Sequence, residues 1–301
     1  MRRVCVVGAG PAGLMAAEVL ADAGCDVQVM EAKPSVGRKF LMAGKSGLNL
    51  TKQVTPQVLK DAYGGSVDLD AWLAEFGVEE VCTWAQNLGQ EIFVGSSGRV
   101  FPKAMKASPL LRAWLKRLAR KGVTINTRAR LVSLDPLEFE APEGAQSPHA
   151  DAIILALGGG SWSKLGSDGL WTKEALAHVP TEPFGPVNVA LRVAWSPHMT
   201  PHFGMPLKAI TLKAGGRDVT AEAVITKDGL EGGGIYEVSK EVVSGAALHL
   251  DLMPDWSADR LNEVLAKRGK QSWGTFLRKA LRWGPVKQGL FMELARPIPD
   301  N

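Results

Sequence analysis

The sequence is poor in the residues that build disulfide-rich, metal-binding or membrane-spanning proteins. Only three cysteines and five histidines occur in 301 residues. No two cysteines have the spacing of a redox or metal motif, which argues against a disulfide framework and favours a reducing compartment. The histidines also lack metal-ligand spacing, so no metal site is expected. No apolar run approaches the roughly 20 residues that a membrane-spanning helix needs.

An excess of charge of either sign is also missing. The chain has 35 Lys and Arg against 31 Asp and Glu, a net charge of +4. This balance is too small to indicate nucleic-acid binding. The apolar run that follows Arg3 is short and broken by glycine, unlike a signal peptide. We therefore expect a cytoplasmic protein with a small-molecule substrate and no nucleic-acid or membrane partner; the oligomeric state is not indicated.

Glycine, by contrast, is abundant, with 33 residues, and it interrupts the first stretch of the chain. An apolar run at residues 4–7 leads into Gly8-Ala9-Gly10-Pro11-Ala12-Gly13. An amphipathic helical pattern follows, ending at Gly24, and a second apolar run at residues 27–30 ends at Glu31. This order of strand, glycine turn, helix, strand and acid is the fingerprint of dinucleotide binding.

Each glycine of that turn has its own role in the fingerprint. Gly8 permits the tight turn, Gly10 lets the backbone approach a pyrophosphate, and Gly13 lets helix and strand pack closely. The helix N-terminus offers unpaired N–H groups and its positive dipole end to the phosphates. Glu31 falls where a carboxylate can accept hydrogen bonds from ribose hydroxyls. The alternative is a strand–turn–helix without a ligand. It is disfavoured because the spacing of the glycines and the position of Glu31 both match the dinucleotide-binding fingerprint.

The segment after Glu31 predicts further contacts with the ligand. Residues 32–51 are rich in glycine and contain the cations Arg38, Lys39 and Lys45. Glycines allow close approach of the backbone, and cations suit phosphate oxygens. A solvated loop is the alternative.

A second glycine stretch, Gly158-Gly159-Gly160, follows the apolar run at residues 152–155. The run predicts a buried parallel strand, and the glycines would let the chain cross close to a cofactor. The alternative is an ordinary strand end and loop. Two glycine stretches of this kind are stronger evidence together than either is alone. The tryptophans of this region, Trp162 and Trp171, are expected to be packing residues.

The composition changes after three prolines at positions 180, 183 and 186. Short alternating strands separated by glycine turns then indicate an antiparallel sheet or small barrel. The expected strands are 189–193, 210–213, 223–226 and 248–252, and the expected helices are 258–267 and 273–282. We predict three parts: residues 1–186 as the cofactor-binding domain, 187–290 as an inserted β-rich and helical domain, and 291–301 as a tail.

The motifs together resemble a bacterial family of FAD-binding flavoproteins, the aminoacetone oxidase-like or BaiN-like NAD(P)/FAD-dependent oxidoreductases. The resemblance rests on residues 8–13 with Glu31, on 37–41, on 47–51, and on 156–159 with 164–169. It implies an α/β fold, in which a three-layer, Rossmann-like FAD/NAD(P)-binding domain carries an inserted, mainly β domain. Better-known members have a cysteine-containing loop where this chain has residues 45–49, so chemistry that depends on that cysteine does not transfer. Members also continue with a returning C-terminal segment, which is not expected in this chain.

The resemblance implies FAD as the cofactor, with NAD(P)H as a candidate electron donor, and an FAD-dependent oxidoreductase that acts on an unidentified small molecule. The alternative is a dinucleotide-binding protein without turnover. No catalytic side chain is identified. The backbone of Leu131 is expected to meet the adenine. The cofactor-binding residues expected are Gly8, Ala9, Gly10, Pro11, Ala12, Gly13, Glu31, Ala32, Lys33, Gly37, Arg38, Lys39, Asn49, Thr51, Leu131, Ala156, Leu157, Gly158 and Gly159.

Overall fold

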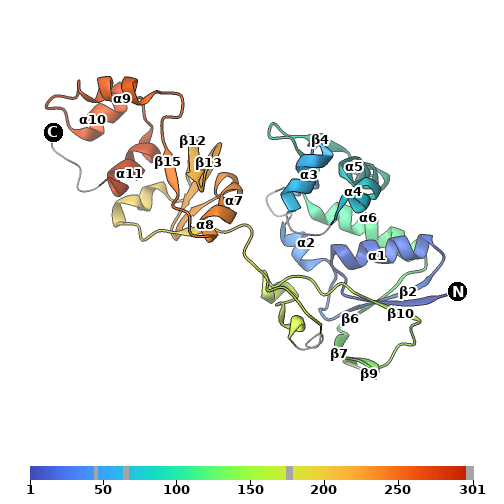
Figure 1. Cartoon of the computed structure of the whole chain (residues 1–301). Helices are drawn as coiled ribbons and strands as arrows, with labels where there is room; N and C mark the ends of the chain where they lie inside the picture. The colour runs from blue at the N-terminus through green and yellow to red at the C-terminus, as the bar shows by residue number, and fades with distance from the viewer. Residues whose placement is uncertain (44–46, 64–67, 174–178, 296–301) are drawn as a thin grey trace. The chain divides into compact units, whose positions relative to one another are not determined.

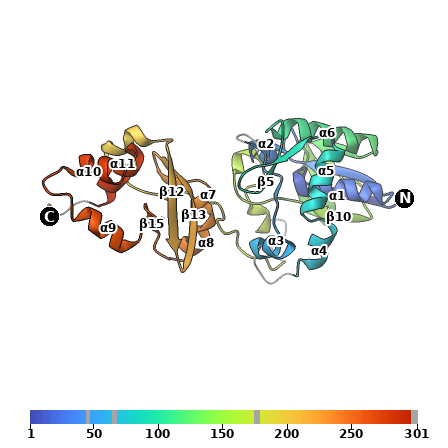
Figure 2. The same ribbon diagram turned by 90° about the horizontal axis from the view of Figure 1, so that it is seen from above.

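The computed structural model describes residues 1–43, 47–63, 68–173 and 179–295. Lys45 and the end of the predicted tail lie outside these ranges. The chain divides into two compact units, residues 1–184 and 185–301, which Figures 1 and 2 show in two views. The assignment of these units to cofactor binding and to an inserted domain stays a prediction.

The first unit mixes parallel strands, short antiparallel strands and helices. Its elements are β1 (Arg3–Val7), α1 (Pro11–Asp22), β2 (Asp26–Glu31), α2 (Arg38–Ala43), β3 (Thr51–Lys52), α3 (Pro56–Tyr63), α4 (Asp70–Glu75), α5 (Val78–Asn87), β4 (Ile92–Val94), β5 (Arg99–Pro102), α6 (Ala107–Arg120), β6 (Thr124–Thr127), β7 (Arg130–Leu134), β8 (Leu137–Ala141), β9 (Gly144–Gln146) and β10 (Ala152–Leu155), followed by 3-10 turns at Ser163–Leu165 and Leu170–Thr172.

A parallel sheet with the strand order β10-β1-β2-β6 forms the centre of this unit. Successive side chains of a strand point to opposite faces, and β1 is apolar on both. Val4 and Val6 pack in one cluster with residues of α1 and α6, whereas Cys5 and Val7 pack in another with Phe139 of β8. The sheet is thus the middle of three layers, between helices and the antiparallel sheet β7-β8-β9. This confirms the predicted α/β, Rossmann-like fold.

Cys5 of β1 lies on the face of this sheet that packs against Phe139 of β8. Only 1% of the residue is exposed. Burial raises the pKa of the Cys5 thiol to about 11, because a thiolate loses its hydration in an apolar environment. Cys5 is therefore a neutral packing residue.

The strand β10 differs from its prediction as a buried strand. Among the described residues it pairs only with β1 and so forms an edge of the sheet, and Ile153 is 38% exposed. The start of the strand is held by Asp151, which accepts hydrogen bonds from the Arg3 backbone at 2.8 Å and from the Arg3 guanidinium at 3.1 Å. The hydrogen bonds that Asp151 accepts from Arg3 lower the pKa of its carboxyl to about 2, and the bond from the side chain has a larger effect than the bond from the backbone.

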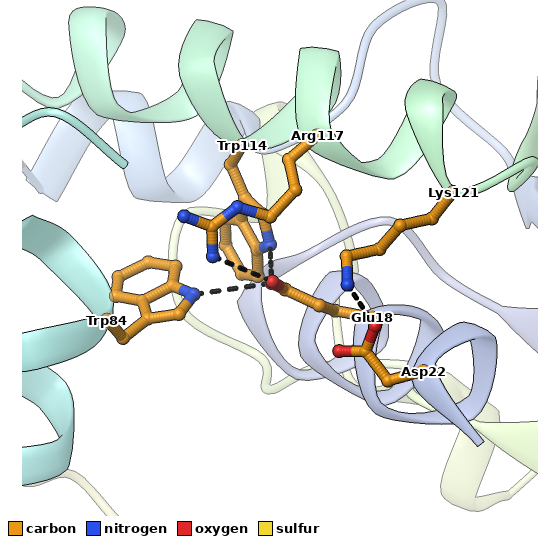
Figure 3. A network of polar contacts seen from close by, with 6 residues as sticks. All are labelled: Glu18, Asp22, Trp84, Trp114, Arg117 and Lys121. Atoms are coloured by element: carbon orange, nitrogen blue, oxygen red, sulfur yellow. Dashed lines mark hydrogen bonds and ion pairs between the residues drawn. The ribbon is translucent and has the colours of Figure 1, made fainter. Parts of the chain in front are cut away.

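A buried carboxylate fixes helix α1 against two other helices. Glu18 is 6% exposed and accepts hydrogen bonds from the indole nitrogens of Trp114 at 2.6 Å and Trp84 at 3.3 Å. Its second oxygen accepts from the Arg117 guanidinium at 2.9 Å. Figure 3 shows these donors converging on Glu18 from α5 and α6. The charge is thus paired and hydrogen-bonded, which is the condition under which a buried charge is tolerated.

The second unit contains a five-stranded antiparallel sheet with the strand order β11-β14-β13-β12-β15. Its elements are β11 (Leu191–Arg192), a 3-10 turn (Pro197–His202), β12 (Pro206–Ala214), β13 (Arg217–Thr226), β14 (Gly229–Glu231), α7 (Gly233–Glu237), α8 (Ser239–Val243), β15 (His249–Asp251), α9 (Ala258–Leu265), α10 (Trp273–Ala280) and α11 (Pro285–Leu294). The predicted strands and the two predicted helices are all found, with ends that differ by a few residues.

Two apolar clusters stabilise the second unit. One lies on the sheet and joins residues such as Leu212 and Ile225 to Ile235 of α7 and Leu290 of α11. The other joins α10 to α11 around Phe276. In the described part of the chain, no helix is both long and apolar enough to cross a membrane.

We expect Glu18→Gln to lower the free energy of unfolding by about 1–3 kcal/mol, because Arg117 loses its charged partner in a buried site. The measurement is urea unfolding followed by circular dichroism and tryptophan fluorescence. Asp22→Asn is the matched control, since Asp22 lies one turn away on α1 and pairs with Lys121 at the surface; it should cost at most about 1 kcal/mol. Equal effects of the two substitutions would contradict a special role for Glu18.

Candidate functional site

The predicted glycine turn lies between β1 and α1, and its outer glycines are fixed by packing. Gly8 has φ +106° and its N–H donates to the Met30 carbonyl at 2.7 Å. A Cβ on Gly8 would lie 2.4 Å from the Ala156 carbonyl oxygen, and one on Gly13 would lie 1.9 Å from the Gly8 carbonyl oxygen. Both distances are impossible for a side chain. Gly13 is therefore required by close packing of helix and strand, as predicted. Gly8 has the positive φ of the predicted tight turn, and its contact with Ala156 is an additional requirement that was not predicted.

Gly10 differs from its neighbours because nothing in the protein crowds it. A Cβ on Gly10 would meet no atom within 4 Å, and its φ of −79° suits any residue. Gly10 is the N-cap of α1 and is followed by Pro11, and no side chain caps this end. The next N–H groups, of Ala12 and Gly13, have no partner within the helix. The turn thus presents unpaired donors and the positive end of a helix dipole to open space, which suits an anionic pyrophosphate.

The carboxylate of Glu31 lies at the edge of this turn. It accepts hydrogen bonds from the backbone N–H of Ala9 and of Lys33, each at 2.8 Å. These two bonds tie the end of β2 to the turn and orient the side chain. A carboxylate has about four lone-pair sites, so acceptor capacity remains. The predicted hydrogen bonds of Glu31 to ribose hydroxyls stay a prediction.

The segment after Ala32 and Lys33 folds back to the glycine turn. The Gly37 N–H donates to the Ala9 carbonyl at 2.9 Å, and Gly37 has φ +61° beside the Leu111 side chain. The Lys33 carbonyl accepts from the Arg128 N–H at 3.1 Å, and the Glu31 carbonyl accepts from the Ala129 N–H at 2.9 Å. These bonds bring the start of β7 to the end of β2.

The cations of α2 bind carbonyl groups in the structure. The Arg38 Nε donates to the Leu165 carbonyl at 2.9 Å. The Lys39 ammonium donates to the carbonyls of Gly159 at 2.7 Å and Ser167 at 2.6 Å. Burial lowers the pKa of Lys39, and the charge of Asp168 acts in the opposite direction. Lys39 therefore ties α2 to the second glycine stretch, and Arg38 ties it to the segment that follows; the predicted phosphate contacts of both cations stay a prediction.

The second glycine stretch lies directly beside the first. The Ala156 N–H donates to the Val7 carbonyl at 2.8 Å, and Leu157 packs in the cluster of Cys5 and Val7. Gly158 has φ +76°, and a Cβ on Gly159 would meet no atom within 4 Å. Both stretches thus reach the same end of β1 and β10, where ligands of parallel sheets bind.

Of the two tryptophans after Gly160, Trp171 is a packing residue as predicted and Trp162 is not. Trp162 is 66% exposed and has φ +54°, so it is not a core residue. Trp171 does contact Phe184 edge-on at 6.0 Å, but its indole nitrogen also donates to the Gly158 carbonyl at 2.8 Å. Sequence reasoning missed this support of the glycine stretch, since no motif marks it.

Three other predicted residues lie on or beside separate short sheets. Leu131 is in β7 and packs in the apolar cluster that contains Leu157. Asn49 is exposed just before β3, and Thr51 pairs with Val100 of β5. The structure thus brings together residues 8–13, 31–33, 37–39 and 156–159, whereas Thr51 belongs to another sheet of the same unit and Asn49 lies just before that sheet.

We expect Gly10→Val to leave the protein folded and to weaken ADP binding by about a hundredfold or more, because the side chain fills the space before two charge-assisted donors worth about 1.5 kcal/mol each. Isothermal titration calorimetry measures the affinity. Gly13→Ala is the contrasting variant: it should lower the unfolding free energy by at least about 2 kcal/mol, because its Cβ collides with backbone. Undiminished ADP binding by folded Gly10→Val would show that the turn is only structural.

Comparison with known proteins adds the family to this geometry. Residues 2–219 match the family described as HI0933-like protein Rossmann domain, and residues 185–291 match the HI0933-like protein barrel and H2TH domain. The first match alone includes the glycine turn, Glu31 and the second glycine stretch.

Two curated relatives and one solved structure illustrate the range of similar proteins. The 3-dehydro-bile acid delta(4,6)-reductase of Clostridium scindens is 28% identical over 88% of this chain and 68% of its own length. The digeranylgeranylglycerophospholipid reductase 2 of Methanopyrus kandleri is 31% identical over 52% of this chain and 37% of its own. The 3-ketosteroid-delta4-(5alpha)-dehydrogenase of Rhodococcus jostii RHA1 is a remote likeness, with 18% identity, a TM-score of 0.40, and coverage of 52% of this chain and 46% of that one.

The match to the Rossmann-domain family covers more than half of the chain. It includes all but the first residue of the first unit and extends into the second. The predicted resemblance to FAD-binding flavoproteins is confirmed. The chain belongs to the HI0933-like family of FAD-binding Rossmann flavoproteins.

Proposed function

We propose that this protein is an FAD-dependent oxidoreductase that reduces a small molecule with electrons from NAD(P)H. The observation that carries the proposal is the glycine turn, in which Gly10 faces open space at an uncapped helix N-terminus beside Glu31. Family membership supports FAD as the dinucleotide. When bound, FAD supplies the hydride and electron transfer, and the protein binds and orients it.

The residues of the turn and their neighbours have distinct tasks in this proposal. The N–H groups at the start of α1 hold the pyrophosphate, and Glu31 accepts from the ribose. The backbone of Leu131 meets the adenine. Gly158 and Gly159 let the second stretch pass close to the cofactor, since a side chain on either would stand between backbone and ligand.

The direction of the reaction is inferred from the relatives. Both curated relatives are named reductases. The chain spans 68% of the length of the first and 37% of the second, so their activities support a reaction class and no particular substrate. We propose reduction of a small organic molecule.

We expect FAD to raise the unfolding midpoint of the purified chain. A ligand that binds only the folded state stabilises it by about 2.7 kcal/mol at a free concentration 100 times its Kd. Thermal unfolding with and without FAD measures this, and Gly10→Val should show no shift. NAD⁺ and NADP⁺ are tested in parallel, because a shift with one of these and none with FAD would assign the turn to a nicotinamide dinucleotide.

We further expect NADPH or NADH to bleach the flavin absorbance of the FAD-loaded protein under anaerobic conditions. Hydride transfer reduces the flavin, and readmitted oxygen should restore the absorbance. Chemical reduction by dithionite is the positive control for a competent flavin. A flavin that dithionite bleaches and neither nicotinamide nucleotide reduces would contradict the proposed electron donor, while leaving FAD binding intact.

A further inference from the structure

Arg128, which directly follows the last residue of β6, has a backbone conformation that is costly for its residue type. Its φ is +62°, in the left-handed region, where glycine and asparagine are much better tolerated than arginine. The residue is also exposed, so it gains no packing in the core that would offset this cost. Such conformations are concentrated at ligand-binding and active sites.

The neighbours of Arg128 hold it in this conformation from both sides. Thr127, just before it, pairs with Glu31 in the parallel sheet. Ala129, just after it, is only 2% exposed and packs in the apolar cluster of β1 and β8. The N–H of Arg128 itself donates to the Lys33 carbonyl at 3.1 Å. The turn is therefore fixed by a strand pair, a buried side chain and a hydrogen bond.

These contacts place Arg128 beside the Glu31 carboxylate. Lys33, which accepts from the Arg128 N–H, donates its own N–H to that carboxylate at 2.8 Å. The strands β1, β2 and β6 lie side by side in that order, and ligands of parallel sheets bind at the carboxyl ends of the strands. The glycine turn, Glu31 and Arg128 stand at the ends of these three strands in the same order.

The guanidinium of Arg128 is not engaged elsewhere in the protein. Among residues that the structure describes, it has no hydrogen bond, ion pair or ring contact. The arginine two positions later is different, because Arg130 pairs with Glu140 of β8 at 2.7 Å. Arg128 thus offers an uncommitted planar cation next to Glu31, whereas Arg130 is held by the neighbouring strand.

We propose that the guanidinium of Arg128 stacks on the adenine ring of the bound dinucleotide. The inference rests on the proposed function, in which the start of α1 holds the pyrophosphate and Glu31 accepts from the adenosine ribose. The pyrophosphate and the base are attached to opposite ends of that ribose, so the base continues along the edge of the sheet toward the end of β6. A guanidinium is flat and stacks on aromatic faces, including those of nucleobases.

An ion pair with a phosphate is the alternative role for this guanidinium. The pyrophosphate belongs at the start of α1, on the other side of Glu31 from Arg128, and the adenosine ribose of FAD carries no further phosphate. NADP⁺ does carry one, at the 2′ position, and an arginine near the ribose can accommodate it. The two roles differ in their requirements, because stacking needs a flat group and a phosphate needs only a positive charge.

Calorimetric titration of the full chain with ADP, FAD, NADP⁺ and inorganic pyrophosphate separates these roles. Arg128→Asn is the main variant, because asparagine tolerates the left-handed conformation. It should weaken ADP and FAD binding about tenfold, as expected for the loss of one stacking contact, and leave pyrophosphate within about twofold. Arg128→Lys should not restore ADP binding. Arg130→Gln is the matched control and should bind all four ligands like the unaltered chain.

Thermal unfolding of the ligand-free chain gives a readout that is independent of binding. Because asparagine relieves the cost of the positive φ, Arg128→Asn should raise the unfolding midpoint while it lowers the affinity for ADP. A gain in stability together with a loss of affinity is expected of a residue that serves the ligand. A lower midpoint with unchanged affinity would make Arg128 a structural residue and would overturn the proposal.

The binding data can overturn the proposal in two further ways. Recovery of ADP binding by Arg128→Lys would show that charge alone suffices, and a loss confined to NADP⁺ would assign the guanidinium to the 2′-phosphate. Both results would leave FAD binding, and with it the proposed function, intact. If the unaltered chain bound neither ADP nor FAD, the proposed function and the stacking role would both be overturned.

Discussion

The contact of backbone on backbone at the start of α1 is the constraint on which the first unit depends. A Cβ on Gly13 would lie 1.9 Å from the Gly8 carbonyl oxygen, and a Cβ on Gly8 would lie 2.4 Å from the Ala156 carbonyl oxygen. Both positions therefore have room for a hydrogen atom and for no side chain. Because three chain segments meet at this point, the helix, β1 and β10 have one relative placement. Gly10 lies between these two close contacts and is itself uncrowded, since a Cβ there would meet no atom within 4 Å.

The Glu18 network holds the other end of α1 and explains why the helix does not shift from that contact. Glu18 lies more than one turn after Gly13, and its donors come from α5 and α6. A buried carboxylate with three donors is tolerated only if every donor stays in place. The helix is thus fixed by close backbone packing at its first turn and by directional hydrogen bonds near its last.

Much of the first unit was predictable because its signals are local. The turn at Gly8, Gly10 and Gly13, the acid at position 31 and the strand before Gly158 are read from short windows of sequence, and the family match agrees with them. The partners of Arg38 and Lys39 were not predictable, since their carbonyl acceptors lie more than a hundred residues later. The same holds for Glu18, whose tryptophan donors read as ordinary apolar residues, and for β10, whose edge position is a property of sheet order.

The glycine turn differs from a site that is built of side chains. It offers backbone N–H groups and a helix dipole, which carry no titratable proton and cannot be changed by a single side-chain substitution except by blocking the space. Gly10 is a position at which the space can be blocked without a collision inside the protein, because a Cβ there would meet no atom within 4 Å. The proposed pyrophosphate site therefore depends on the placement of α1, which Gly13 and Glu18 fix, more than on any side chain of the turn itself.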